Sequence, residues 1–114
     1  MNYKWGIFIA DLSPILGSEQ GGKRPVLVIS DEDFNNIMPV VTILPITTLK
    51  KGRKIYPNEV LLNAGTGGIL LDSIILTHQI RTISKERLTN SIGLIARNGI
   101  QESINNTLRI HLNL

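Results

Sequence analysis

Short apolar runs separated by turn-forming residues cover the first half of the chain. Residues 5–12, 25–30 and 40–46 are each rich in β-branched, aromatic or other apolar residues, and turn-forming residues flank them. This pattern is typical of short strands. Residues 25–30 carry apolar side chains at consecutive positions, so we expect that strand to be buried on both faces.

Two more strand regions follow a basic connector at residues 50–54. Residues 56–62 are expected to form a strand at a sheet edge, because Pro57 cannot donate a hydrogen bond to a neighbouring strand. Residues 69–83 are expected to carry one or two strands. The connector itself has two open interpretations, a solvated loop or a mobile arm that contacts phosphate.

Three helical segments are predicted. Residues 31–36 read as a turn or a short surface helix, and Ser84 is expected to cap a short helix over residues 84–88. From about residue 97 onward an apolar residue recurs at every fourth position, which indicates an amphipathic helix. Its stripe contains Ile100, Ile104, Leu108 and Leu112, with Asn105, Asn106, Thr107 and Arg109 mainly outside.

Many short strands followed by one helix predict a mainly β fold with some α structure, a small SH3-like β-barrel or twisted sheet with a C-terminal helix against it. With 114 residues, we expect a single domain over residues 1–114. Aromatic residues make up only 4% of the chain. The core must therefore consist mainly of Ile, Leu and Val, and rows of rings for stacking bases are excluded.

Charge and cysteine content limit the chemistry. The net charge of +3 is compatible with a polyanionic partner without requiring one. The absence of cysteine excludes disulfides, zinc–thiolate sites and a thiol nucleophile. The first eleven residues do not resemble a signal peptide, and no apolar run reaches membrane-spanning length. We therefore expect a cytoplasmic protein with no membrane partner.

The loop at residues 17–25 concentrates groups that bind anions. Gly21 and Gly22 let the backbone approach a ligand closely, and Arg24 offers a planar fork of donors suited to phosphate. Glu19 and Gln20 add a carboxylate and an amide. A solvated hairpin loop that happens to carry two cations is the alternative.

Several blocks of sequence occur together in the order and spacing of one protein family. The chain resembles the MazF/PemK family of toxin endoribonucleases from type II toxin–antitoxin systems. The blocks that carry the resemblance are residues 10–14 with the loop 17–25 and the run 26–29, then residues 45–47, then residues 72–76 with 79–83, and finally residues 84–89.

The resemblance implies a PemK-like small β-barrel with a C-terminal helix, a homodimer, and a cognate antitoxin protein that neutralises it. It also implies cleavage of single-stranded RNA, mRNA in particular, at short sequence motifs without a metal or other cofactor. The family's catalytic arginine and threonine fall on Arg24 and Thr47. Candidate RNA-binding residues carried over from the motifs are Glu19, Gln20, Gly21, Gly22, Asp72, Ser73, Gln79 and Arg81.

The expected chemistry is consistent with these residue types. RNA supplies its own nucleophile, the 2′-hydroxyl, and leaves 2′,3′-cyclic phosphate and 5′-hydroxyl ends. Arg24 can stabilise the charge that develops on the phosphate, and Thr47 can donate a hydroxyl to the same group. Glu19 is able to accept a proton, but the residues do not identify the general base or acid.

Some positions depart from the family pattern. His78 stands where family members often carry an acidic residue; it is either an added acid or phosphate contact or, as we favour, an exposed strand histidine. Ile7 and the pair at residues 70–71 replace charged residues. His111 is expected at the surface of the terminal helix.

Two other function classes remain open. One is a non-catalytic inhibitor of DNA gyrase, as in the similarly folded CcdB toxins, against which the Arg24 loop argues. The other is a small barrel that binds nucleic acid without cutting it. A gyrase assay and an RNA cleavage assay separate the three.

Overall fold

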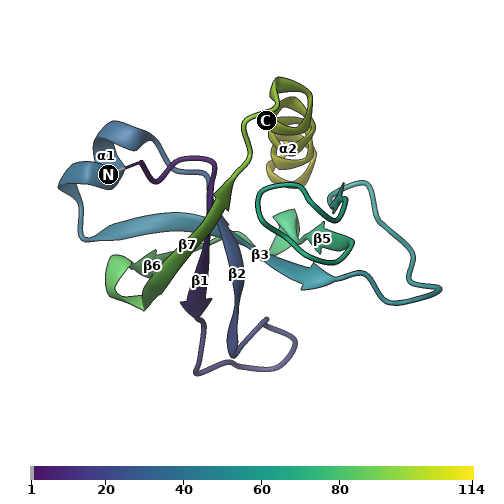
Figure 1. The fold of residues 1–114 in the computed structure, drawn as a ribbon, viewed down its shortest axis with the longest axis horizontal. Coiled ribbons are helices and arrows are strands. Elements are labelled where there is room, and N and C mark those ends of the chain that lie inside the picture. Colours follow the sequence, from purple (N-terminus) through teal and green to yellow (C-terminus); the bar gives the residue numbers. More distant parts are fainter. Residues whose placement is uncertain (1) are drawn as a thin grey trace.

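The computed structural model describes residues 2–114 and consists of a seven-stranded antiparallel sheet with two α-helices (Figure 1). The sheet order is β4-β5-β3-β2-β1-β7, with β6 paired to β3 off this path. This confirms the predicted mainly β fold with a C-terminal helix. The elements are β1 (Gly6–Asp11), β2 (Lys23–Val28), α1 (Glu32–Ile37), β3 (Val40–Thr48), β4 (Val60–Leu62), β5 (Ser73–Ile75), the 3-10 helix η1 (Thr77–Gln79), β6 (Arg81–Ser84), the 3-10 helix η2 (Lys85–Arg87), β7 (Leu88–Leu94) and α2 (Asn98–Leu112).

The long strand β3 organises the sheet because it pairs with three other strands. It pairs with β6 through residues 40–43, with β2 through residues 43–45 and with β5 through residues 46–48. Within residues 2–114 no ladder joins β6 to β7. The sheet therefore curls like a small barrel but is not closed between β6 and β7.

Side chains on the two faces of β1, β2 and β3 form two cores. In β2, Val26 and Val28 point to one face and Leu27 to the other, and all three are fully buried. The prediction of a strand buried on both faces is thus confirmed. The inner core consists of Phe8, Ala10, Leu12, Val26, Val28, Val41, Ile43 and Ile83. The helix-side core consists of Ile7, Leu27, Leu44, Ile46, Val60, Leu62, Ile69, Ile75, Ile95 and Ile104.

Helix α2 covers the helix-side core near β4 and η1. Ile104 is fully buried, and Ile100 and Leu108 pack partly buried beside it. Two expectations for this helix were wrong. Leu112 is exposed, since the core ends before it. Thr107 is buried against η1, where its hydroxyl lies 3.0 Å from that of Thr77 and so keeps a hydrogen-bond partner.

Other boundaries differ from the predictions. The expected edge strand over residues 56–62 shortens to β4, while residues 69–83 form the two strands β5 and β6 with η1 between them. Ser84 caps η2 as expected, because its hydroxyl accepts a hydrogen bond from the Glu86 amide. The edge strand β7 was not predicted. Its sequence has no regular alternation, and pairing with β1 defines it.

The loop at residues 63–72 packs on β7 backbone to backbone. Gly68 has φ +83°, and a Cβ there would lie 2.0 Å from the carbonyl oxygen of Ile92. A Cβ on Gly93 would lie 2.1 Å from the carbonyl oxygen of Gly67. Neither glycine leaves room for a side chain, so the loop lies directly against the backbone of β7.

Substitution Gly93→Ala is therefore expected to lower the free energy of unfolding by about 1–3 kcal/mol, because the backbone must move to admit the methyl group. Urea denaturation measures the change. Gly99→Ala is the matched control, since nothing lies within 4 Å of a Cβ built in this first turn of α2. Equal stability of the two variants would contradict the close packing.

Candidate functional site

Arg24 and Thr47 lie on the inner-core face at one end of the β2–β3 pair. This antiparallel ladder ends with Val26 opposite Pro45. Continuing the register by two residues sets Arg24 opposite Thr47, on the same face as Val26. Pro25 has no N–H to donate, which accounts for the end of the ladder at this point.

Arg81 shares this face. It pairs with Ile43, an inner-core residue, and side chains of directly opposite residues point to the same side of a sheet. Arg24 itself pairs with Ala10, another inner-core residue. The inner face is therefore apolar in its middle and carries two arginines toward the Thr47 end.

The guanidinium of Arg24 is held at one nitrogen and open at the other two. Its Nε donates to the Gly21 carbonyl at 2.8 Å, and its terminal nitrogens have no hydrogen-bond partner among residues 2–114. Within residues 2–114 both ion pairs are made by Glu59. Neither Arg24 nor Arg81 therefore has a carboxylate partner among these residues. An oriented, uncompensated arginine of this kind favours a bidentate anion.

The loop between β1 and β2 is closed by its own contacts. Gly22 has φ +72°, which favours glycine, and its amide donates to the Ser13 hydroxyl at 3.2 Å. The carboxylate of Glu19 accepts a hydrogen bond from the Leu16 amide at 2.6 Å. Glu19 therefore folds back onto its own loop.

Gln79 connects this loop to η1. Its side-chain oxygen accepts from the Gln20 amide, and its side-chain nitrogen donates to the Ser18 carbonyl, each at 3.4 Å. These distances are at the long end for hydrogen bonds, so the contacts are weak. The fold nevertheless brings Gln20 and Gln79, which are 59 residues apart in sequence, to the same place.

Asp72 and Ser73 belong to the frame of the site. The Asp72 carboxylate accepts from the Ala64 amide at 2.8 Å, and its carbonyl accepts from the Leu49 amide at 2.9 Å. Ser73 is buried, and its hydroxyl donates to the Leu71 carbonyl at 2.7 Å. Both residues hold the ends of β3 and β5 together.

A cavity of about 330 Å³ lies beside Thr47. Pro25 and Ile46 line it from the sheet, and Leu70 and Leu71 line it from the loop before β5. The two leucines are 89% and 62% exposed. The departure from charged residues at this point therefore leaves two exposed leucines near Thr47, on the side of the sheet that carries Ile46.

Arg87 is a site residue that reasoning from individual residues did not single out. Its Nη1 donates to the carbonyls of Asp11 and Ser13, at 3.0 and 2.6 Å. These contacts fix the start of the loop that carries Arg24. The only signal in the sequence was its place in the last block of the family resemblance.

Glu59 is a buried carboxylate that binds the side chains of Arg53 and His78. It accepts from both terminal nitrogens of Arg53, at 2.9 and 2.8 Å, from the Tyr56 amide at 3.0 Å and from His78 Nε2 at 2.9 Å. The hydrogen bond from Arg53 is the main cause that lowers the pKa of Glu59 to about 2. The same bond raises the pKa of Arg53.

This cluster revises two interpretations. His78 lies on η1 rather than on a strand, and it is paired with Glu59. The basic connector is anchored through Arg53, so at this residue it is not a mobile arm. His111, at the surface of α2 as expected, has its ring centroid 6.4 Å from that of His78.

The cluster predicts loss of stability in acid. Because the pKa of Glu59 falls from 4.5 to about 2 on folding, its contribution is complete above about pH 4.5 and is lost as the pH falls toward 2. The free energy of unfolding of wild type should exceed that of Glu59→Gln by about 1–3 kcal/mol near pH 6, and this difference should disappear in strong acid. Urea unfolding across this range measures it, with the exposed Glu102→Gln as control. A constant gap would contradict the assignment.

Within residues 2–114, no helix is both long and apolar enough to cross a membrane. The described residues also contain no cluster of three or more His, Asp or Glu side chains placed to hold a metal ion.

Comparison with known proteins gives a consistent result. Residues 3–112 match the family described as "PemK-like, MazF-like toxin of type II toxin-antitoxin system". Endoribonuclease EndoA of Bacillus subtilis is 46% identical over 86 residues, which cover 75% of this chain and 73% of that protein. Endoribonuclease MazF of Staphylococcus saprophyticus is 38% identical over 108 residues, covering 95% of this chain and 88% of that protein.

Solved structures share the fold. The crystal structure of MazF from Deinococcus radiodurans has a TM-score of 0.82 at 24% identity, covering 99% of this chain and 97% of that one. An endoribonuclease from a mycobacterial species, in complex with its cognate antitoxin, has a TM-score of 0.81 at 21% identity, covering 100% and 97%. At this level of identity the likeness concerns the fold alone.

Proposed function

We propose how this chain, which belongs to the PemK-like, MazF-like family of toxins from type II toxin–antitoxin systems and is an endoribonuclease, cuts its substrate. In this proposal Arg24 and Thr47 cut single-stranded RNA at one end of the inner-core face. The observation that carries this proposal is the open guanidinium of Arg24. It is oriented by Gly21, has no carboxylate partner among residues 2–114, and lies on the same face as the hydroxyl of Thr47.

Arg24 acts on the phosphate. When the 2′-hydroxyl of the RNA attacks, negative charge builds up on the non-bridging oxygens of the phosphate. The two terminal nitrogens of Arg24 donate to these oxygens, and because Nε is already bound to Gly21 the fork needs little reorganisation. Arg81, on the same face, adds a second positive charge that attracts the RNA strand.

Thr47 supplies a neutral donor at the same phosphate. Its backbone is fixed by pairing with Ile74 on β5, so the sheet sets the face from which its side chain projects. The Glu19–Gln20–Gly21–Gly22 stretch, which Gln79 contacts through Gln20, forms the loop beside Arg24 and binds the RNA. Asp72 and Ser73 support the site through their bonds to backbone.

The partners follow from the family and from the charge of the site. We propose a homodimer, a cognate antitoxin protein that blocks RNA cleavage, and a cytoplasmic location, where messenger RNA is found. We also propose that residues 1–114 act as one toxin domain without a metal or other cofactor. Inhibition of DNA gyrase is not favoured, since the curated relatives named above are both endoribonucleases.

The direct test is to incubate the purified protein with a long RNA in EDTA and to map the new ends. We expect cuts at a short recurring motif, with 5′-hydroxyl ends and 2′,3′-cyclic phosphates, and no effect on gyrase supercoiling in a parallel reaction. Protection of the RNA without cutting, or dependence on added Mg²⁺, would contradict the proposed function.

A further inference from the structure

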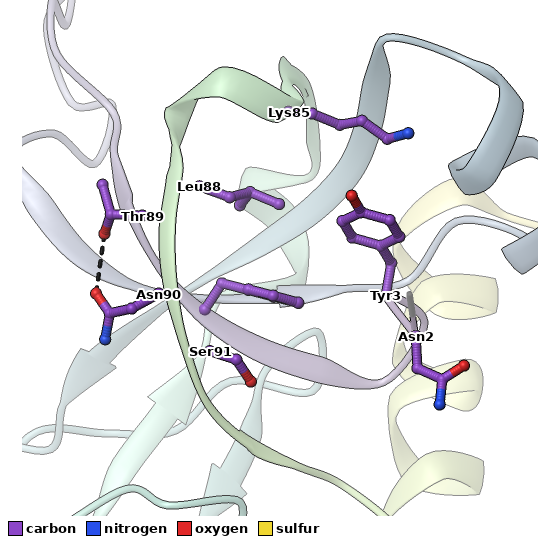
Figure 2. Close-up of a pocket in the computed structure, with 8 residues that line it drawn as sticks. Asn2, Tyr3, Lys85, Leu88, Thr89, Asn90 and Ser91 are labelled. Atoms are coloured by element: carbon purple, nitrogen blue, oxygen red, sulfur yellow. Dashed lines mark hydrogen bonds between the residues drawn. The ribbon is translucent and has the colours of Figure 1, made fainter.

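A cavity of about 320 Å³ opens beside β7, apart from the site around Arg24 and Thr47 (Figure 2). Two inner-core side chains, the buried Phe8 and the half-buried Leu88, line it with apolar surface. Figure 2 shows Leu88, Ser91 and Tyr3 on one side of β7 and Asn90 on the other, with Lys85 reaching toward the tyrosine ring. The volume falls in the range of ligand-binding pockets.

The lining has the chemistry that a nucleotide needs. The Tyr3 ring offers an aromatic face. The hydroxyl of Ser91, which pairs with Phe8 and shares its face of the sheet, offers a donor and an acceptor for the edge of a base. The Lys85 ammonium lies 4.9 Å from the centroid of the Tyr3 ring. A cation next to an aromatic platform suits a base together with its phosphate.

The tyrosine is held in place by α1. The carboxylate of Glu32 accepts from the backbone amide of Tyr3, with a shortest distance of 2.8 Å, and from that of Lys4 at 3.0 Å. Burial alone would raise the pKa of Glu32, but these hydrogen bonds together outweigh burial and lower the pKa. A ring near the chain terminus is thereby pre-positioned, which reduces the entropy lost when a ligand binds.

The cavity lies on the same face of the sheet as Arg24. Leu88 pairs with Ala10, and Ala10 pairs with Arg24, so the three residues form one row across β7, β1 and β2. A second cavity, of about 550 Å³, shares Thr89 with this one and is lined by Lys23 and Arg87 together with Asp11 and Glu86. Charges of both signs therefore lie between Arg24 and the first cavity, where Lys85 forms no ion pair within residues 2–114.

We propose that this cavity is a subsite for a nucleotide of single-stranded RNA that flanks the cleaved step. The base packs on Tyr3, the base edge meets Ser91, and Lys85 binds the phosphate. The inference rests on the proposed RNA cleavage and extends it to a second contact on the substrate. The Lys85 ammonium, which has no carboxylate partner within residues 2–114, favours RNA over a peptide as the occupant.

The test uses two RNAs that share one cleavage motif, a short RNA that ends close to the cut and a long RNA with flanks on both sides. The variants are Tyr3→Leu and Lys85→Ala. A matched pair of controls exists elsewhere on the surface, because the Lys54 ammonium lies 5.2 Å from the ring centroid of Tyr56. Tyr56→Leu and Lys54→Ala therefore repeat both changes away from the cavity.

For the long RNA we expect Tyr3→Leu to raise KM roughly 5- to 100-fold with kcat unchanged, the effect of losing one stacked base. Lys85→Ala should raise KM and reduce its dependence on salt concentration. Cleavage of the short RNA should not change, and the controls should match wild type on both RNAs.

An equal change in KM for the two RNAs, or no change in KM with either variant, would overturn the proposed subsite while leaving the cleavage function intact. Weaker binding of the antitoxin with an unaltered KM for long RNA would also overturn it, in favour of a protein contact. If wild type cuts neither RNA, the proposed function fails and the subsite fails with it. Because Tyr3 packs against the inner core, Lys85→Ala provides the decisive result should Tyr3→Leu unfold.

Discussion

Arg24→Ala is expected to lower the rate of RNA cleavage by roughly 10²- to 10³-fold, the usual effect of removing one preorganised donor from a transition state. The loss should appear in kcat, because the charge that Arg24 stabilises develops only as the phosphate reacts. Single-turnover cleavage of an end-labelled RNA measures it. Stability should change little, since Arg24 is partly exposed and makes one hydrogen bond to Gly21.

Two further variants make the result specific. Arg24→Lys keeps the charge but removes the planar fork, so it should recover little of the activity. Arg109→Ala removes the same charge from the exposed side of α2, where the guanidinium contacts only Asn106, and should cleave like wild type. Full activity of Arg24→Ala would remove the basis of the proposed mechanism.

Thr47→Val is expected to reduce kcat by roughly 10²-fold, because it deletes a donor to the phosphate while keeping the shape of the side chain. The fold should tolerate the change, since valine is well accepted in strands. The same single-turnover assay applies, with circular dichroism to confirm the fold.

Thr42→Val is the matched control for this second prediction. It lies on the same strand β3 but, by alternation, on the opposite face, where its hydroxyl lies 2.8 Å from that of Thr82. It should cut RNA at the wild-type rate. If both threonine variants lose activity equally, the effect belongs to β3 as a whole and not to a hydroxyl at the phosphate.

Local sequence patterns were sufficient for much of the fold. Consecutive β-branched residues predicted the doubly buried β2, and apolar spacing predicted α2, because both signals depend on neighbours in sequence. Strand β7 could not be found this way, since its pairing with β1 supplies what its sequence lacks. Thr107 was misplaced for a similar reason: the partner that makes its burial favourable, Thr77, lies on another element.

The site shows the same division. Residue chemistry and the family resemblance pointed to Arg24 and Thr47, but only strand register indicates that they share a face. The buried Glu59 was not recognised, because its three side-chain and backbone partners converge only after η1 and the connector have folded together. The bracing of the Arg24 loop by Gln79 and Arg87 likewise depends on tertiary contacts.

The most direct test of the mechanism is to replace the ribose at one mapped cleavage step by its 2′-deoxy form. In an RNA that contains two copies of the motif, we expect the modified copy to stay intact while the other is cut at the normal rate, because the 2′-hydroxyl is the nucleophile that Arg24 and Thr47 assist. Cleavage of the modified copy at an unchanged rate would contradict this account, since the nucleophile would then have to come from water or from the protein.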